Sequence, residues 1–408
     1  MAGWEDESRT ARNGNHSLKL EKDVVMCRNL RPTVGALVLT LVLVAGAGAG
    51  AAELPKATQK VLAELKLDPS LMNGLDKELE VPQAWLDGAA KEEEVVILGT
   101  WPNKQFRVMT APFRERYPQI KLNYHRSGTK ARGLNVVIAL REGRVIADVL
   151  TSIADAFLQF HQMKAFANLR ELPGIKNVPS DYISADGTWV SHKLSYRCIG
   201  YNTNSVKKAD MPQKWDDLLT DPRWHDGRLA ISNHPNSWLL GLWGSLGEQW
   251  GENFTRRLFE VVKPQLRKEG MSATTALTVA GELFANLPAP EWQIQNYIDK
   301  GAPVSYHCPE PVPITLSQIV MMEKSPHRNG ARIFINWILS REGQLLQYYD
   351  SYVIPVHEAL QQPRFVSVFD SIKGKKKNIR DDTLLGSPMH KKMLKTWNSY
   401  WSGATGSK

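Results

Sequence analysis

Short apolar runs alternate with helically spaced segments through the first part of the chain. Three runs have the length and composition of buried strands, and they lie at 94–98, 120–124 and 147–150. Apolar residues recur at helical spacing in the intervening segments, at 104–116, 134–146 and 153–166. Strand–helix repeats of this length predict right-handed crossovers and an open, mostly parallel sheet.

The same alternation continues beyond residue 190. The pattern predicts strands at 195–202, 228–232 and 304–307, and helices at 215–219, 237–246, 275–282 and 331–348. Asn236 or Ser237 is a suitable N-cap for the second of these helices. Short polar helices are predicted at 56–86. Neither a repeat nor a long linker interrupts 90–360, so we expect lobes joined by crossing strands rather than separate beads.

Three small, hydroxyl-rich loops follow the first three predicted strands. They read Gly-Thr-Trp at 99–101, Ser-Gly-Thr at 127–129 and Thr-Ser at 151–152. Ligands of open α/β sheets lie beyond the carboxyl ends of the strands, and two of these loops precede helix N-termini, which attract anions. As an alternative, the hydroxyls only cap helices, a role worth about 1 kcal/mol. Lys130 and Arg132 fit either an anion site or a solvated helix face, and we favour the solvated face.

Residues 28–52 have the three parts of a secretory signal peptide. Arg28 and Arg31 precede an apolar run, and the run ends in small residues. We expect cleavage between Ala49 and Glu53, which would export residues 53–408. A retained membrane anchor is the alternative, because 34–52 is just long enough to span a bilayer. Met26 is an alternative start, since residues 1–25 fit no part of a signal peptide.

Charge and cysteine content narrow the class of protein. The 408 residues carry a net charge of +9, which favours an anionic partner. The basic run at 373–377 is typical of a surface loop, and export argues against nucleic acid. The 3 cysteines exclude a disulfide-dense scaffold and a four-cysteine zinc site. Cys198 and Cys308 would remain after cleavage, and a pair in an exported protein permits a disulfide.

Motifs of enzyme catalysis are sparse. Residues 127–130 match Ser-x-x-Lys, but the Ser-Asp-Asn and Lys-Thr-Gly motifs that this chemistry needs do not occur in the chain. The sequence also lacks a Gly-x-Ser-x-Gly elbow, a His-Glu-x-x-His helix and a phosphate-binding Gly-x-x-x-x-Gly-Lys loop. The histidines are scattered. We therefore expect neither an enzyme nor a bound metal or cofactor.

Four segments, in this order, resemble a known family. They are GRVIADV at 143–149, IGYNTN at 199–204, MPQKWDDLL with PRW within 211–224, and NGARIFINW with SREGQ within 329–344. Their order resembles that of bacterial extracellular solute-binding proteins with the periplasmic binding protein type II fold. The most similar subgroup is that of the iron(III)-, thiamine- and phosphonate-type binding components of ABC transporters.

The resemblance implies two α/β lobes joined by two crossing strands, with the ligand bound between them. Residues 91–197 and 308–408 would form lobe one and 198–307 lobe two, after a helical extension at 53–90. The outward crossing would be 195–202 and the return 304–313. Cys198 and Cys308 would then lie on neighbouring hinge strands, either as a disulfide or as two buried thiols.

The resemblance also implies a set of ligand-binding residues. By position they are Thr100, Trp101, Ser127, Gly128, Thr129, Thr151, Ser152, Asn236 and Ser237. Iron-binding members of the family use adjacent tyrosines after a segment that resembles 281–282. Residues 283–288 read LFANLP, so the iron site does not carry over.

From the resemblance we expect a monomeric periplasmic receptor that delivers a small solute to an inner-membrane ABC permease. The solute would be anionic or zwitterionic and would be captured by hinge closure. Two alternatives stay open, namely a secreted enzyme on the same two-lobed scaffold and a ligand-binding sensor without transport.

Overall fold

The computed structural model describes residues 53–128, 131–153 and 156–405. The predicted signal segment, Met26 and Thr129 lie outside this part of the chain. Within it, no helix has both the length and the hydrophobicity that crossing a membrane requires.

The strands of the described residues form two mostly parallel sheets that share strand β4. The order is β2-β1-β3-β9-β4-β7-β5-β6, with β10 beside β9 and β8 beside β4. The strands are β1 (Glu94–Gly99), β2 (Lys121–Arg126), β3 (Val149–Thr151), β4 (Val190–Asn202), β5 (Leu229–Ser232), β6 (Gln265–Arg267), β7 (Ala285–Pro290), β8 (Val304–His307), β9 (Val312–Met321) and β10 (Lys377–Ile379). β1, β2 and β3 are parallel to one another, as are β5, β6 and β7. The predicted two-lobed α/β fold is therefore confirmed.

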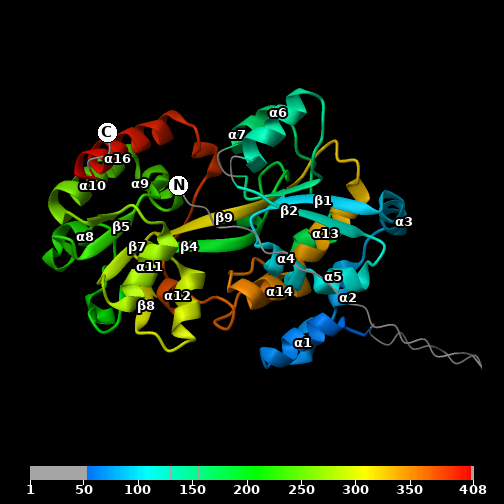
Figure 1. Ribbon diagram of the computed structural model, residues 1–408, viewed down its shortest axis with the longest axis horizontal. Coiled ribbons are helices and arrows are strands. Elements are labelled where there is room, and N and C mark those ends of the chain that lie inside the picture. Colours follow the sequence, from blue (N-terminus) through cyan, green and yellow to red (C-terminus); the bar gives the residue numbers. More distant parts are fainter. Residues whose placement is uncertain (1–52, 129–130, 154–155, 406–408) are drawn as a thin grey trace, which may run out of the picture. The chain divides into compact units, whose positions relative to one another are not determined.

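Strands β4 and β9 connect the two lobes. The first part of β4 pairs with β9, and its second part pairs with β7 and β8 (Figure 1). The return crossing was predicted at 304–313, which is wrong, because β8 stays in the second lobe and β9 makes the return. Pro311 and Pro313 made this segment look like a loop. A proline is tolerated at the beginning of a strand, and that is where Pro313 lies.

Two predicted helices are each divided in two. The helix at 104–116 is α4 (Asn103–Met109) followed by α5 (Ala111–Arg116), because Pro112 has no N–H to continue the helical hydrogen bonds. The helix at 331–348 is α13 (Arg328–Leu339) followed by α14 (Arg341–Ser351). The break is at Ser340, whose backbone is extended and whose hydroxyl accepts a hydrogen bond from the N–H of Gly343.

A small residue is required just after this second break. A Cβ atom on Gly343 would lie 2.3 Å from the carbonyl oxygen of Trp337. Only glycine therefore allows α14 to approach the end of α13 this closely.

The helix predicted at 153–166 is shorter than expected, and forms α7 (Phe157–Gln162).

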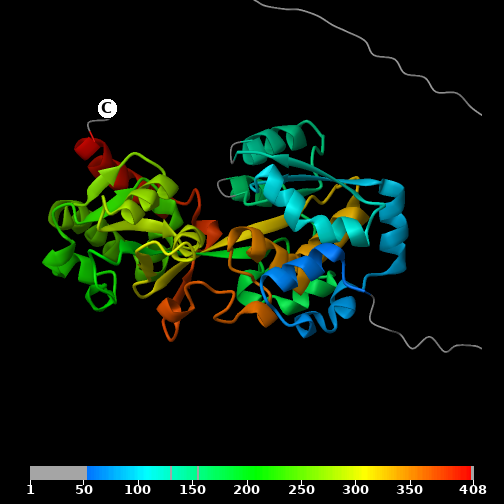
Figure 2. The same ribbon diagram turned by 60° about the horizontal axis from the view of Figure 1, so that its bottom comes forward.

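The segment before β1 packs on the first lobe as short helices, as predicted. These are α1 (Lys56–Glu64), α2 (Leu75–Leu79) and α3 (Gln83–Glu92). α1 contacts α14, shown in blue and orange in Figure 2, and α3 contacts α13. The fully buried carboxylate of Glu342 on α14 accepts hydrogen bonds from the Thr58 hydroxyl, the Arg116 guanidinium and the Trp337 indole. One buried carboxylate thus connects α1, α5, α13 and α14.

The last helix of the chain packs on the second lobe. Helices here are α8 (Asp217–Thr220), α9 (Leu239–Leu246), α10 (Glu248–Arg257), α11 (Met271–Ala280), α12 (Glu291–Ile298) and α16 (Pro388–Thr405). Met393, Trp397 and Trp401 of α16 are buried in the same hydrophobic core as Trp238 and Trp243. The expected assignment of all of 308–408 to lobe one is therefore wrong for α16. The apolar face of α16 is covered by α9 and α10, which lie in lobe two.

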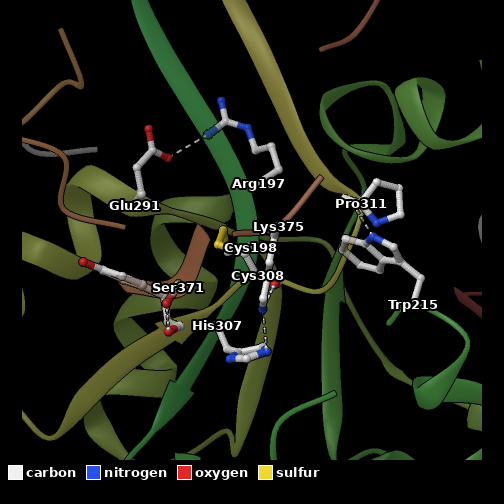
Figure 3. The surroundings of a disulfide bond; sticks show 10 residues. Arg197, Cys198, Trp215, Glu291, His307, Cys308, Pro311, Ser371 and Lys375 are labelled. Atoms are coloured by element: carbon white, nitrogen blue, oxygen red, sulfur yellow. Dashed lines mark hydrogen bonds and ion pairs between the residues drawn. A yellow bond between two sulfur atoms is a disulfide. The ribbon is translucent and has the colours of Figure 1, made fainter. Parts of the chain in front are cut away.

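A disulfide joins β4, the strand that runs through both lobes, to the segment after β8. Cys198 on β4 and Cys308 are bonded, with Cα atoms 4.5 Å apart, and both are buried (Figure 3). Lys375 donates a hydrogen bond to the carbonyl oxygen of Cys308 at 2.6 Å. Trp215 donates another to the carbonyl oxygen of Pro311 at 2.9 Å. The polypeptide on both sides of Cys308 is thus held in place where the chain turns back towards β9.

Candidate functional site

The carboxyl ends of β1, β2 and β3 meet at one edge of the first sheet, because the three strands are parallel neighbours. A Cβ atom on Gly99, the last residue of β1, would lie 2.9 Å from the ring of Tyr124, 3.0 Å from the ring of Trp101 and 3.1 Å from Oγ1 of Thr151. The N–H of Ser127 donates to the carbonyl oxygen of Gly99 at 3.0 Å. The structure thus brings together three of the predicted loops around one glycine.

Trp101 is the aromatic centre of this edge. It is 3% exposed, and its ring lies 5.0 Å from that of His192 and 6.2 Å from that of Tyr124. The Tyr124 hydroxyl donates to the carbonyl oxygen of Trp101 at 2.7 Å, which fixes the start of the loop. The indole Nε1 of Trp101 has no hydrogen-bond partner among the described residues.

Arg132 lies in this site. The prediction that it lies on a solvated helix face is therefore wrong. It belongs to a π-helical turn, Ala131–Asn135, that precedes α6 (Val136–Arg141), and it is 2% exposed. Its guanidinium donates hydrogen bonds to the carbonyl oxygens of Ser127 and Ser152, the latter at 3.0 Å. Arg132 therefore holds the loops after β2 and β3 together, and its Nε has no partner in the described structure.

Ser152 has an unusual backbone conformation at the end of β3. Its φ angle is 55°, in the left-handed region that non-glycine residues rarely adopt. Its N–H donates to the carbonyl oxygen of Gln318 on β9 at 2.8 Å. Such a conformation costs about 1–3 kcal/mol, and residues of this kind cluster at functional sites.

Strand β4 adds two cations that the sequence analysis did not identify. After an irregularity between Ser191 and Lys193, side chains of Lys193, Ser195 and Arg197 follow the two-residue period of one strand face. Nζ of Lys193 lies 6.0 Å from the centre of the Trp101 ring. Alternate polar residues in an otherwise apolar strand are the signal for these cations. The strand predicted at 195–202 contains Arg197 but is too short to include Lys193.

Arg197 is paired with a buried carboxylate from lobe two. Its guanidinium lies 3.3 Å from the carboxylate of Glu291, which is 1% exposed and is the first residue of α12 (Figure 3). Burial raises the pKa of Glu291, and Arg197 opposes that rise. Burial also lowers the pKa of His234, in the loop after β5, and the charge of Arg197 lowers it further.

The cations act on one another within this site. Burial lowers the pKa of Lys193 to about 8; the charges of Arg197 and Arg132 add to that effect, whereas Glu291 opposes it. Burial similarly lowers the pKa of Arg132. Three cations therefore share a poorly hydrated region with one carboxylate.

Many polar groups of this region are buried without a protein partner among the described residues. The donors are Nε1 of Trp101, Nε of Arg132, Nε of Arg197 and Nε2 of Gln318, and the hydroxyls are those of Ser127 and Thr151. Leaving one such group unpaired costs about 1–3 kcal/mol. Unpartnered donors and hydroxyls of this kind can bind a guest that is rich in hydrogen-bond acceptors.

The other predicted residues have different surroundings. Thr100 is partly buried, Gly128 is exposed, and Thr129 lies outside the described residues. Asn236 and Ser237 form a short turn after β5 and line a cavity of about 410 Å³ with Leu385, Leu394 and Asn398 from the C-terminal segment. Neither caps α9, whose N-cap is Trp238. The carbonyl oxygen of Asn236 accepts a hydrogen bond from Arg380 at 3.0 Å, which secures the turn.

Within the described part of the chain, no three metal-ligating side chains gather in a cluster. His192 is fully buried at the back of Trp101, and burial lowers its pKa to about 3. The Gln347 carboxamide lies 2.8 Å from its Nδ1. His192 therefore stays neutral at physiological pH and serves to support the aromatic ring.

Comparison with known proteins places this arrangement among solute-binding proteins. Residues 145–367 match the model of the family described as bacterial extracellular solute-binding protein. Iron uptake protein A1 of Synechocystis sp. (strain ATCC 27184 / PCC 6803 / Kazusa) is 27% identical over 213 residues, which cover 48% of this chain. The aligned part spans only 58% of that relative's length.

Solved structures resemble the fold over most of their length. Iron-bound HitA from Pseudomonas aeruginosa is 18% identical with a TM-score of 0.61, and the match covers 75% of this chain and 99% of that one. The periplasmic binding protein AfuA from Actinobacillus pleuropneumoniae, with exogenous fructose-6-phosphate bound, is 18% identical with a TM-score of 0.60, over 76% and 98% of the two chains. At these identities the likeness shows the type II periplasmic binding protein fold alone.

Proposed function

The chain belongs to the family of bacterial extracellular solute-binding proteins, and we propose that it is the periplasmic solute-binding component of an ABC transporter. Its solute would be a small molecule that carries an oxyanion. The supporting observation is the group of Arg132, Lys193 and Arg197 beside unpartnered hydrogen-bond donors at the carboxyl ends of β1, β2 and β3. Hydrogen bonds from charged donors are worth about 1.5–3 kcal/mol each.

Both lobes would contribute to capture. Trp101, Ser127 and Thr151 belong to the first lobe, whereas Glu291 and His234 follow strands of the second. β4 and β9 carry the connection between the lobes, so bending of these strands would bring the two groups together over the solute. Thr100, Gly128 and Ser152 would contribute backbone or hydroxyl contacts at the same edge. Asn236 and Ser237 would support the loop that carries His234.

We propose an oxyanion rather than ferric ion as the cargo. The names of two of the proteins given above mention iron, so ferric ion is the competing hypothesis for the cargo. The positive charges of Arg132, Lys193 and Arg197 would repel a trivalent cation, and Glu291 is the carboxylate paired within this group. A metal-free, oxygen-rich anion fits this electrostatic environment better.

Binding without catalysis is the function that these groups support. His192, whose ring contacts that of Trp101, has a pKa of about 3 and cannot act as a base near neutral pH. A secreted enzyme on this scaffold would need a nucleophile and a base in contact. A sensor and a transport receptor would differ only in the protein that recognises the closed, solute-bound form. We propose that this partner is an inner-membrane permease and that the receptor is a monomer.

Export would precede this function. We propose that residues 28–52 direct the chain to the periplasm and that cleavage falls between Ala49 and Glu53. N-terminal sequencing of the protein from a periplasmic fraction tests this directly. Recovery of the full-length chain with the membranes would instead support a retained anchor.

A thermal-shift panel tests the receptor function. Phosphonates, sulfonates, carboxylates, polyamines and sugars are each added to the purified exported chain. We expect an oxyanion to raise the melting temperature, and Lys193→Met to abolish the rise. Lys121→Met is a matched control, because Lys121 is exposed at the opposite end of β2. A panel without any stabilising compound, combined with turnover of a hydrolase substrate, would contradict the proposal.

A further inference from the structure

We propose that a groove between α1 and α4 binds an acidic, amphipathic α-helix of a partner protein. The groove has a volume of about 610 Å³, and α5 and α14, which each contact both helices, close it from below. None of its lining residues belongs to the candidate solute site, and α1 lies outside the residues, 145–367, that match the family model. The inference therefore goes beyond the proposed receptor function and does not depend on the identity of the solute.

The floor of this groove is apolar and recessed. Val61 of α1 and Leu346 of α14 line it and are only 3% and 1% exposed. Val108 of α4 lies beside them and is 36% exposed, although it is a large hydrophobic residue. A partner's apolar side chain placed here would remove Val108 from water and would also contact the aliphatic stems of the flanking lysine and arginine side chains.

Three exposed cations flank the apolar floor, namely Lys60 on α1 and Lys104 and Arg107 on α4. Nζ of Lys60 lies 3.7 Å from the carboxylate of Glu64, which also accepts a hydrogen bond from the hydroxyl of Tyr349. Lys104 and Arg107 form no ion pair within the described residues. The charge of the groove is therefore least balanced on the α4 side.

The pKa values of neighbouring groups reflect this positive charge. Burial lowers the pKa of Arg114 on α5, and the charge of Arg107 lowers it further. Burial raises the pKa of Asp350 on α14, and the charge of Lys104 opposes that rise. Carboxylates of a partner would offset the repulsion between Arg107 and Arg114, whereas a cationic partner would add to it. Charge complementarity thus favours an acidic partner.

The walls of the groove favour a helical occupant over an extended one. All four surrounding elements are α-helices, whose backbone N–H and C=O groups bond mostly within each helix, so the groove offers no strand edge to an extended peptide. A helix satisfies its own backbone and can place apolar residues at i, i+3, i+4 and i+7 on the floor, with carboxylates on either side. α1 has 9 residues and is roughly 13 Å long, so two to three turns of a partner helix would cover the groove.

An anionic lipid surface shares the charge of this occupant but not its shape. A layer of lipid headgroups would meet the exposed side chains of Lys104 and Arg107. It would not reach Leu346, which is buried between the helices. A convex helix contacts both the cations and the recessed floor, so we assign the groove to a protein partner.

Designed peptides test the assignment on the exported chain. The probe is a helical peptide of about fifteen residues, with leucine at i, i+3, i+4 and i+7 and with glutamate and alanine elsewhere. One comparison peptide has lysine in place of glutamate, and another has the same composition with leucine at every second position. By calorimetric titration, we expect the acidic probe to bind at least tenfold more tightly than either comparison peptide. Absence of binding, or equal binding of a comparison peptide, would overturn the inference.

Variants of exposed residues locate the binding. The double variant Lys104→Glu, Arg107→Glu should reverse the preference, so that the lysine peptide binds more tightly than the acidic probe. Val108→Asp should weaken binding of the acidic probe at least tenfold. Lys121→Glu is the matched control, because Lys121 is an exposed lysine that does not line the groove, and it should leave the affinity unchanged.

Two further measurements separate this inference from its competitors. All of these variants should keep the wild-type melting temperature, because the replaced side chains are exposed. Folded variants that bind the acidic probe as tightly as the wild type would show that the peptide binds elsewhere, which would overturn the inference. Vesicles of phosphatidylglycerol are tested alongside the peptides. Binding of the vesicles without binding of the acidic probe would assign the groove to a lipid surface and refute a protein partner.

Discussion

The guanidinium of Arg197 lies 3.3 Å from the carboxylate of Glu291, and the pairing of β4 with β7 fixes this relationship. Arg197 is opposite Pro290 in that pairing, so the next residue, Glu291, begins α12 beside the guanidinium. Glu291 is thereby the carboxylate that offsets part of the positive charge contributed by β4. The pair stabilises the junction between the lobes and weakens the attraction of the site for anions.

Replacing Glu291 should separate these two effects. Glu291→Gln removes the charge but keeps the shape, which leaves Arg197 buried without a counter-charge. We expect a loss of about 3 kcal/mol in the free energy of unfolding, and tighter binding of an oxyanion solute to the folded protein. Chemical denaturation and calorimetric titration measure the two quantities.

Glu282→Gln is the matched control, because Glu282 is exposed on the same lobe. It should change the free energy of unfolding by less than about 0.5 kcal/mol. If Glu291→Gln weakened anion binding, Glu291 would contact a donor on the solute instead of only moderating the charge of Arg197.

Lys193 should cost stability in the solute-free protein. Its pKa falls from 10.5 in the unfolded chain to about 8 in the folded one, so between these values the unfolded state binds more protons. The destabilisation caused by charged Lys193 is therefore complete below pH 8. It decreases as the pH rises from about 8 to 10.5, so the free energy of unfolding increases over that range. We expect Lys193→Met to stabilise the protein by about 2 kcal/mol at pH 7. The difference from the wild type should shrink towards pH 10.5; a difference that stays constant with pH would contradict the lowered pKa.

The disulfide should contribute substantially to stability because it closes a long loop. Cys198 and Cys308 are 110 residues apart in sequence. Closing a loop of this size is worth about 4–5 kcal/mol in the chain-entropy model. The double variant Cys198→Ala, Cys308→Ala should lose a comparable free energy of unfolding. Mass spectrometry of alkylated peptides should find both cysteines protected until a reductant is added, and alkylation without reduction would show that the pair is open.

The first half of the site followed from local sequence patterns, whereas its cations did not. The loops at Trp101, Ser127 and Thr151 end apolar runs, and parallel strands place such ends at a common edge. Arg132 and Lys193 reach this edge through tertiary contacts. Nothing local distinguishes a buried arginine in a helical turn from a solvated one. A regular two-residue alternation of polar and apolar residues likewise does not predict the irregularity in β4 between Ser191 and Lys193.

Proline and long-range packing account for the main errors in the fold. β7 reads Ala-Asn-Leu-Pro-Ala-Pro and β9 begins Val-Pro, so both look like loops by composition. Their neighbours in the sheet override this preference. The placement of α16 depends on which lobe offers a surface for Trp397 and Trp401, and the sequence of the helix alone carries no such information.

The helical extension before β1 should depend on Glu342, which is fully buried and accepts hydrogen bonds from Arg116 at 2.8 Å and from Thr58 at 2.5 Å. Arg116→Met would leave this carboxylate without its cation, which costs about 3 kcal/mol when the partner is buried. We expect limited proteolysis to cut within residues 53–93 of this variant before the rest of the chain.

Arg114→Met is the matched control, because Arg114 lies on the same helix and donates to a backbone carbonyl oxygen, that of Arg107. It should keep the wild-type pattern of proteolysis. The double variant Arg116→Met, Glu342→Gln should recover part of the lost stability, since it removes the uncompensated charge together with its partner. If both arginine variants were equally sensitive to protease, the extension would be held by its apolar contacts, such as Val61 and Leu62, and not by the buried ion pair.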